Sequence, residues 1–224
     1  MGHFIVMDGL DGSGKGTQSE LLASALEAEG RSVKLISFPH YGTPGAAAVE
    51  FYLGGKLGSD PAATNAYAAS TFYAVDRYLS FRTEWGEFLR GEGNVVIANR
   101  YTSANAVHQL SKLPREEWDA FLAWLGDFEF DRLGLPRPDL TVYLEMTPAI
   151  SMRLVSHRSL ATGQKKDIHE LDPRHLEASY AAAIYAAEKW GWHRLPCYVG
   201  DEPRSIEDIA ADVRCAVDGV LNLR

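Results

Sequence analysis

The apolar positions of this chain gather in five short runs, separated by longer stretches with helical spacing. The runs cover residues 3–8, 33–38, 94–98, 140–145 and 195–199. Runs of this length are typical of buried strands, and their alternation with helical stretches predicts an α/β fold with a mostly parallel sheet covered on both faces. Ligands of such sheets bind beside the carboxyl ends of the strands. The residues that follow each run are therefore the first candidates for chemistry.

Length, composition and charge narrow the class of protein. The chain has 224 residues, of which 46% are hydrophobic, and we expect one domain over 1–224 with a sizeable core. Its net charge of −8 argues against non-specific nucleic-acid binding, which needs a basic surface. No apolar run approaches the length of a membrane span. The two cysteines lack metal-ligand spacing and suit a reducing compartment, so we expect a cytoplasmic protein.

The first run leads into a glycine-rich loop, because residues 9–17 read Gly-Leu-Asp-Gly-Ser-Gly-Lys-Gly-Thr and contain Gly-x4-Gly-Lys. Leu21, Leu22, Ala25 and Leu26 follow with the spacing of the core face of a helix. Strand, loop and helix in this order indicate a phosphate-binding loop, in which backbone N–H groups, the helix N-terminus and Lys15 surround phosphate groups. The alternative is an ordinary glycine-rich turn, which the flanking strand and helix disfavour.

Aromatic and basic residues follow the second run and the next helical stretch. Phe38-Pro39-His40-Tyr41-Gly42 places rings at the ligand edge of the sheet, although a hydrophobic strand end followed by an ordinary turn is the favoured explanation of this motif taken alone. Tyr73 and Arg77 share one face of a helix expected to begin near Ala62. A ring beside a guanidinium can stack on a base and bond its edge. A core aromatic with a surface arginine is the alternative.

Arg100 lies just past the third run, at the expected ligand edge. Opposite a phosphate loop, a second phosphate is the natural partner of such an arginine, although a nearby carboxylate would also satisfy it. Asn105 and His108 follow and offer polar groups to a small ligand, or are ordinary residues of a helix surface.

A local excess of basic residues distinguishes residues 150–170 in this acidic chain: Arg153, His157, Arg158, Lys165 and Lys166. Residues 156–169 lack helical periodicity, which resumes at Leu176 and Tyr180. We interpret this segment either as a basic lid, over about 156–170, that stabilises charge during phosphoryl transfer, or as a solvated loop.

Taken in order, these motifs resemble the thymidylate kinases, nucleoside-monophosphate kinases that phosphorylate dTMP. The motifs are Gly-Leu-Asp-Gly-Ser-Gly-Lys-Gly-Thr, Phe-Pro-His-Tyr-Gly, Phe-Tyr-Ala-Val-Asp-Arg, Asn-Arg-Tyr-x3-Asn and the basic segment ending near Glu170, and together they cover almost the whole chain. The resemblance implies a P-loop NTPase fold with about five parallel strands and a short flexible lid. It also implies ATP and Mg²⁺ as cofactors, dTMP as acceptor, no nucleic-acid or membrane partner, and a homodimer.

The resemblance implies a role for each motif residue. On the ATP side it assigns the residues that hold the phosphates or the adenosine end: Gly9, Gly12, Ser13, Gly14, Lys15, Gly16, Thr17, Arg153 and Arg158. Asp11, Thr17 and Glu170 would serve the metal, and Asp11, Lys15, Arg100 and Arg158 would be catalytic. On the acceptor side it assigns the pocket walls and the groups that touch dTMP: Asp11, Phe38, Pro39, Tyr41, Tyr73, Arg77, Arg100, Asn105 and His108.

Three positions depart from the family pattern. Asn99 stands where most members have aspartate, which removes a carboxylate that would orient magnesium. Gly16 stands where many phosphate loops have a magnesium-binding hydroxyl, and Thr17 follows as a substitute. His40 stands where many members have arginine, so the acceptor phosphate would depend more on Arg100.

Two other functions remain open from the sequence. The chain could phosphorylate another acceptor, either a different monophosphate or a deoxynucleoside, for which Asp11 is the obvious candidate base. It could also be a non-catalytic nucleotide-binding module, although Lys15, Arg100 and a basic segment favour catalysis.

Overall fold

The computed structural model describes residues 1–58, 60, 63–162 and 173–222, with the side chains of 158–162 and 173 outside this description. Its strands are β1 (His3–Gly9), β2 (Val33–Ser37), β3 (Val95–Asn99), β4 (Leu140–Glu145), β5 (His193–Pro196), β6 (Tyr198–Val199) and β7 (Glu202–Pro203). Its α-helices are α1 (Lys15–Ala28), α2 (Ala47–Leu53), α3 (Ala66–Ser80), α4 (Gly86–Arg90), α5 (Thr102–His108), α6 (Trp118–Gly126), α7 (Pro148–Thr162), α8 (Pro173–Trp190) and α9 (Ile206–Leu221). Two π-helical segments, Phe81–Trp85 and Asp127–Arg132, follow α3 and α6. Short 3-10 turns lie at Pro44–Ala46, Leu110–Lys112 and Arg115–Glu117.

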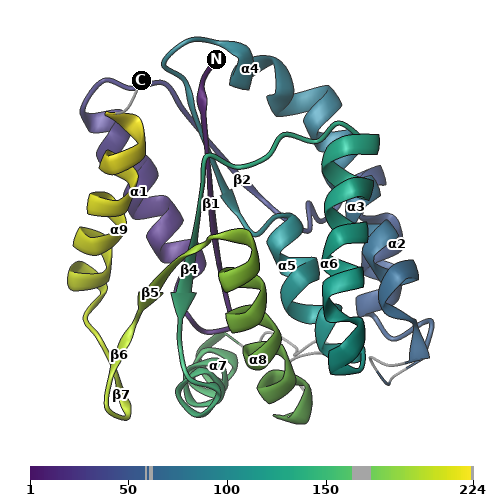
Figure 1. Cartoon of the computed structure of the whole chain (residues 1–224). Coiled ribbons are helices and arrows are strands. Elements are labelled where there is room, and N and C mark those ends of the chain that lie inside the picture. The colour runs from purple at the N-terminus through teal and green to yellow at the C-terminus, as the bar shows by residue number, and fades with distance from the viewer. Residues whose placement is uncertain (59, 61–62, 163–172, 223–224) are drawn as a thin grey trace.

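The main sheet has five parallel strands in the order β2-β3-β1-β4-β5, which confirms the predicted fold class. Strand β1 lies at the centre, with Met7 beside Asn99 of β3 and Gly9 beside Leu144 of β4. The carboxyl ends of these strands meet at one edge, which is the lower end of the sheet in Figure 1. Strands β6 and β7 form a separate antiparallel pair.

Helices cover both faces of the sheet. Helices α1 and α9 lie on one face, and α5, α6 and α8 lie on the other, with α2 and α3 further out (Figure 1). Alternate residues of β1 serve the two faces, as a strand requires. Ile5 and Met7 pack with the buried residues of α1 and α9, whereas Phe4 and Val6 pack with Trp85 in a second core. The central strand is therefore buried on both sides and holds the loop that follows it.

Some predicted boundaries were wrong. The last parallel strand begins at His193 and ends at Pro196, which has no N–H to continue the ladder, and Tyr198 belongs to the antiparallel pair. Helix α3 begins at Ala66 rather than near Ala62, because the side chain of Asn65 caps it by accepting a bond from the Ala68 N–H at 2.8 Å.

Two helical patterns also differ from prediction. Leu22 and Leu26 of α1 are buried as expected, but Leu21 and Ala25 face solvent. The buried face of α1 is therefore narrower than the sequence pattern of these four residues predicted. Residues 156–162 were predicted to lack helical structure, yet α7 continues through them, because neither glycine nor proline interrupts the chain between Pro148 and Gly163. Residues 163–170 of the predicted lid lie outside the described residues.

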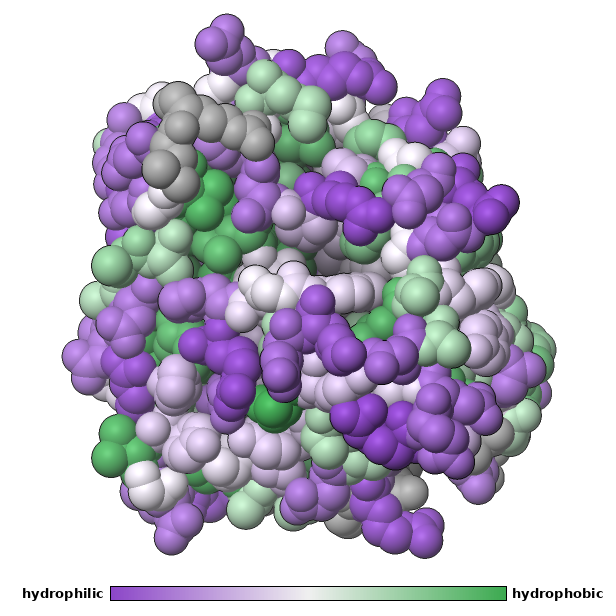
Figure 2. Space-filling view, viewed as in Figure 1, coloured by the Kyte–Doolittle hydropathy of each residue, from purple (hydrophilic) through white to green (hydrophobic). Residues whose placement is uncertain are grey.

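One face of the molecule is mainly polar. Figure 2 shows hydrophilic residues over most of one face, with hydrophobic residues in small separate areas. Within the described residues, every helix is too short or too polar to cross a bilayer.

Candidate active site

The glycine-rich loop connects β1 to α1 and makes two tight turns. Gly12 and Gly14 have φ values of 83° and 89°, a left-handed conformation that side chains with a Cβ rarely adopt. A Cβ at Gly12 would also lie 3.0 Å from the Ser151 carbonyl oxygen, because the first turns of α7 pack against the loop. The Ser151 hydroxyl donates to the Asp11 carbonyl oxygen. The loop is thus held from both sides, with the N-terminus of α1 at its end.

Lys15 begins α1 and turns back over the loop. Its Nζ donates to the Leu10 carbonyl oxygen at 2.8 Å and lies 3.6 Å from Oδ1 of Asp11. Its side chain is only 8% exposed, yet the residue lines a cavity of about 620 Å³. A nearly desolvated ammonium in that position supplies a strong local positive charge to a phosphate.

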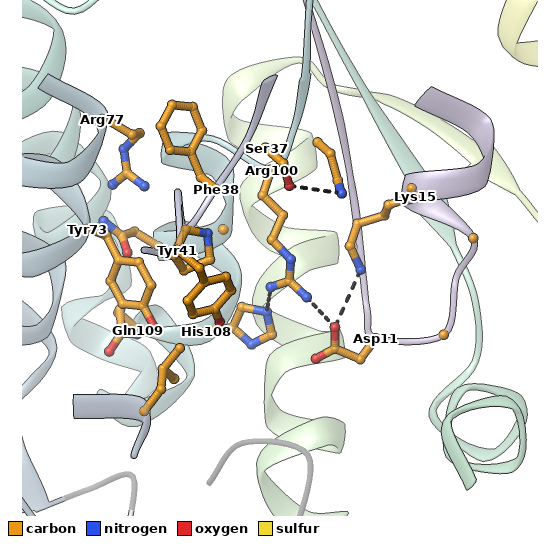
Figure 3. A pocket seen from close by; sticks show the side chains of 18 of the residues that line it. Asp11, Lys15, Ser37, Phe38, Tyr41, Tyr73, Arg77, Arg100, His108 and Gln109 are labelled. Carbon is orange, nitrogen blue, oxygen red and sulfur yellow. Dashed lines mark hydrogen bonds and ion pairs between the residues drawn. The ribbon is translucent and has the colours of Figure 1, made fainter. Parts of the chain in front are cut away.

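Arg100 approaches the same point from the end of β3. Its backbone has a φ of 69°, and its N–H donates to the Met7 carbonyl oxygen of β1 at 2.9 Å. Its guanidinium pairs with Asp11 and bonds Nε2 of His108 at 3.1 Å. Figure 3 shows this chain of contacts, in which Asp11 lies between the cations of Lys15 and Arg100.

The far wall of the cavity comes from β2, α3 and α5. Tyr73 and Arg77 line it from the same face of α3, and Figure 3 shows both on the side opposite Lys15. The ring of Tyr73 meets that of Tyr52 edge-on, with centroids 6.3 Å apart. His108 closes the wall, and its ring stacks on His175 of α8 at 5.8 Å between centroids.

Most residues predicted for the site lie around this one cavity. From the loop these are Asp11, Gly12, Gly14, Lys15, Gly16 and Thr17. From the other elements they are Phe38, Pro39, Tyr41, Tyr73, Arg77, Arg100, Asn105 and His108. Residues separated by up to 97 positions in the sequence therefore surround one space, from Asp11 to His108 (108 − 11 = 97).

Other predicted residues are not in the cavity wall. Gly9, the last residue of β1, and Ser13 of the loop are both buried. Arg153 points to the β6–β7 pair, where it donates to the Asp201 carbonyl oxygen and to Glu202, each at 2.9 Å. Its guanidinium is therefore engaged there, because α7 presents it towards that hairpin. Arg158 lies in α7 with its side chain outside the description, and Glu170 lies outside the described residues.

His40 also turns away from the cavity. Its Nδ1 lies 3.3 Å from Glu84, and its backbone N–H donates to Asp76 at 2.8 Å. Burial raises the pKa of Asp76, and the His40 N–H partly opposes this rise. These contacts anchor the turn after β2, so that Phe38 and Pro39 remain in the cavity wall.

The structure adds five residues to which sequence reasoning gave no site role, together with Asn99, which it noted only for the loss of a carboxylate. Ser37, Leu53, Asn99, Ala104, Gln109 and Leu154 complete the wall. Asp8 lies beneath it, where its carboxylate accepts from the Gly9 N–H at 2.8 Å and from the Ser103 hydroxyl at 2.5 Å. Asp8 directly precedes the motif of residues 9–17, and Ser37 directly precedes that of residues 38–42, so their positions in the sequence could have indicated a place near the site. Nothing in the local pattern marked Leu53 or Leu154.

Oxygen atoms near the phosphate loop are suited to a hard cation. Asp11 and Thr17 line the cavity, and Asn99 joins them. The Nδ2 of Asn99 donates to Ser37 Oγ at 3.3 Å, which leaves its buried Oδ1 without a partner among the described residues. The described residues contain no group of three His, Cys, Asp or Glu that could hold a metal by itself. A cation here would need oxygens from a bound nucleotide, as Mg²⁺ in kinase sites does.

A parallel sheet with a phosphate loop after its central strand, and a second cation facing that loop, defines the P-loop nucleotide-binding class. Comparison with known proteins narrows this class. The family model for thymidylate kinase matches residues 7–189, so the chain belongs to the thymidylate kinase family.

Individual relatives support the same assignment. A thymidylate kinase of Mycobacterium tuberculosis is 37% identical over 194 residues, covering 84% of this chain and 87% of the relative. A probable thymidylate kinase of Thermococcus gammatolerans is 33% identical and covers 95% of this chain and 94% of its own length. A solved thymidylate kinase from Candida albicans shares the fold, with a TM-score of 0.70, 19% identity and coverage of 97% and 92% of the two chains.

Proposed function

We propose that this protein transfers the γ-phosphoryl group of ATP to dTMP, forming ADP and dTDP. The observation that carries the proposal is the meeting of Lys15, Asp11 and Arg100 in one cavity whose opposite wall presents Tyr73 and Arg77. Phosphate chemistry at one end and a base-sized pocket at the other fit a nucleoside monophosphate as acceptor. Membership of the thymidylate kinase family supports dTMP as that acceptor.

The donor phosphates belong over the loop and the start of α1. There the backbone N–H groups of Gly12 to Thr17 and the helix N-terminus favour negative charge. Lys15 adds a point charge close to the transferred group. Arg153 is bonded to the β6–β7 pair, so an adenosine role for it would need that contact to change. The roles of Arg158 and Glu170 stay predictions.

The acceptor belongs on the α3 and α5 side. Tyr73 would stack on thymine, with Arg77 and Asn105 at the base edge. Phe38 and Pro39 would wall the sugar, with the exposed Tyr41 reaching the phosphate. His108 would crowd a 2′-hydroxyl group and so favour deoxyribose.

The reaction needs positioning and charge neutralisation more than proton transfer. The acceptor oxygen of dTMP is already a phosphate anion, so no strong base is required. Lys15 and Arg100 would stabilise the charge that develops on the moving phosphoryl group, and Arg100 would bridge the two phosphates. For this role Arg100 must exchange its bond to Asp11 for phosphate oxygens.

Magnesium fits the oxygen atoms present on the donor side. Asp11 and Thr17 would hold the ion or its water molecules, and the buried Oδ1 of Asn99 is placed to accept from such a water. When bound, Mg²⁺ supplies positive charge to the phosphate oxygens.

The decisive experiment measures ADP release at fixed Mg-ATP with dTMP, dUMP, AMP, CMP or thymidine as acceptor. Strong turnover with dTMP and little with AMP or thymidine supports the proposal, whereas preference for thymidine would indicate a nucleoside kinase. Lys15→Ala is the control and should lower kcat by about 10²–10³-fold or more. ATP binding without turnover of any acceptor would favour a non-catalytic module.

We also propose a cytoplasmic homodimer. The neighbouring helices α2 and α3 expose apolar side chains at Phe51, Val75 and Leu79, which would be buried by a second copy. Cys197 and Cys215 are free thiols, which suits a reducing compartment. Sedimentation of the wild type against Val75→Glu tests the dimer, and a monomeric wild type would refute it.

A further inference from the structure

A buried carboxylate, Glu129, lies directly behind the proposed base pocket. It is 0% exposed and sits in the π-helical segment after α6. Its Oε1 accepts from Nη2 of Arg77 at 2.6 Å and from Nδ2 of Asn105 at 3.1 Å. Its Oε2 accepts from Nε of Arg77 at 2.7 Å and from the Thr102 hydroxyl at 2.8 Å. One acid thus collects four donors from α3 and α5.

These bonds determine what Arg77 can offer to a ligand. The side chain is 1% exposed, so its charge depends on Glu129 as counter-ion. Two of its five N–H groups bond Glu129, and a third donates to the Tyr101 carbonyl oxygen at 3.3 Å. The remaining N–H groups have no acceptor among the described residues, and Arg77 lines the cavity. Arg77 therefore presents donors alone.

The same acid fixes the orientation of the Asn105 amide. The Nδ2 of Asn105 donates to Glu129 and also to the Ser70 carbonyl oxygen at 3.3 Å. A carboxylate can only accept, so the nitrogen must face Glu129 and the oxygen must face the other way. Asn105 lines the cavity, so this orientation leaves its Oδ1 as an acceptor. Arg77 thus offers hydrogen-bond donors to a bound base, and Asn105 offers an acceptor. We call this fixed arrangement of donor and acceptor the polarity of the pocket edge.

We propose that Glu129 is a positioning residue that sets this polarity and thereby selects a base with a keto oxygen beside a ring N–H. Thymine and uracil carry that pattern at O4 and N3–H. Cytosine carries the reverse, an amino group beside an unprotonated ring nitrogen. Glu129 itself does not line the cavity and acts through Arg77 and Asn105. The inference rests on the proposed function, because it concerns how that site recognises its acceptor.

Glu129→Gln tests the inference, because an amide keeps the volume but replaces one acceptor oxygen by a donor. Arg77 then loses a bond to an anion, and the Asn105 amide is free to reverse. We expect the KM for dTMP to rise about tenfold and the dTMP:dCMP ratio of kcat/KM to fall about tenfold, or about 1.4 kcal/mol, with the KM for ATP unchanged. Where dCMP reacts too slowly, its inhibition constant against dTMP gives the ratio.

Glu145→Gln is the matched control. Glu145 is also buried, 4% exposed, and it accepts from Tyr180 at 2.8 Å and from Nε of Arg194 at 2.9 Å, away from the cavity. It should lower the melting temperature without changing the dTMP:dCMP ratio. A folded Glu129→Gln enzyme with the wild-type ratio, or with equal loss on both acceptors, would overturn the inference.

Thr102→Val keeps the inference testable if Glu129→Gln does not fold. It removes one donor to Oε2 and leaves the acid, Arg77 and Asn105 in place. The dTMP:dCMP ratio of kcat/KM should fall about two- to threefold. If the melting temperature falls but this ratio does not change, Glu129 has a purely structural role and the inference is wrong. Failure of the proposed function gives a different result, because the wild-type enzyme would then show no turnover of dTMP.

Discussion

The backbone of Arg100 allows its contribution to function to be separated from its contribution to stability. Its φ of 69° lies in the left-handed region, which costs a residue with a Cβ about 1–2 kcal/mol. Glycine has no such cost. Arg100→Ala and Arg100→Gly remove the same guanidinium, with its bonds to Asp11 and His108, and differ only in the conformational freedom of the backbone.

The expected difference follows from two opposing terms. Glycine relieves about 1–2 kcal/mol of left-handed strain but loses about 0.4–1 kcal/mol to its freer unfolded chain. Arg100→Gly should therefore be more stable than Arg100→Ala by about 0.5–1 kcal/mol, or about 1–4 °C in melting temperature for a domain of this size. Loss of the Asp11 ion pair affects both variants equally and cancels. Catalysis should fall in both by about 10²–10³-fold or more, because neither retains a cation at the phosphates.

Two measurements check this prediction. Urea unfolding gives the free energies of the two variants, and coupled ADP release gives kcat/KM for dTMP. If the glycine variant is no more stable than the alanine variant, the backbone strain assigned to residue 100 is wrong. If Arg100→Ala retains activity within about tenfold of wild type, Arg100 does not stabilise the transferred group.

Three further outcomes are expected. Tyr73→Ala should raise the KM for dTMP about tenfold with little effect on ATP, because its ring lines only the acceptor side, and an unchanged KM would remove it from the pocket. Asn99→Asp should lower the Mg²⁺ concentration needed for half-maximal rate, since it adds a carboxylate where a buried oxygen lacks a partner among the described residues; unchanged magnesium dependence would exclude a metal role. Burial lowers the pKa of Lys112 to about 8 from 10.5, so between these values the unfolded chain binds more protons and this position gains stability as pH rises. Lys112→Met should remove that gain from the pH profile of unfolding, and identical profiles would contradict it.

The loop side of the site could be predicted because its signals are local. Gly12, Gly14 and Lys15 lie within a few residues of one another, between a strand and a helix that each have a clear hydrophobic pattern. Their geometry follows from that short sequence. Arg100 could be placed for the same reason, since the end of β3 beside β1 brings it to the loop. What the sequence left open there was its partner, and the structure shows both Asp11 and His108.

The sequence does not determine the direction in which a long polar side chain turns. Arg153 and His40 both belong to motifs near the ligand edge, yet each turns to a carboxylate outside the cavity, Glu202 for one and Glu84 for the other. Both acids lie far away in the sequence, and residue type alone does not tell an arginine or histidine which anion it meets. Helix spacing has the same limit in α1, where Leu21 faces solvent beside the buried Leu22.

Glu129 shows why base recognition was the least predictable part of the site. Sequence spacing places Tyr73 and Arg77 on one helix face, and this suffices to suggest a base. Which base depends on whether each polar group donates or accepts, and that is decided by an acid 52 positions after Arg77 in a segment with no motif of its own. Acids and aromatic residues alternate there from Asp127 to Asp131, so the local sequence does not distinguish the buried Glu129 from its exposed acidic neighbours. A buried acid costs too much free energy to persist without donors, and here Arg77, Asn105 and Thr102 supply them. The specificity of this pocket is therefore a property of the contact between two elements, and neither element carries it alone.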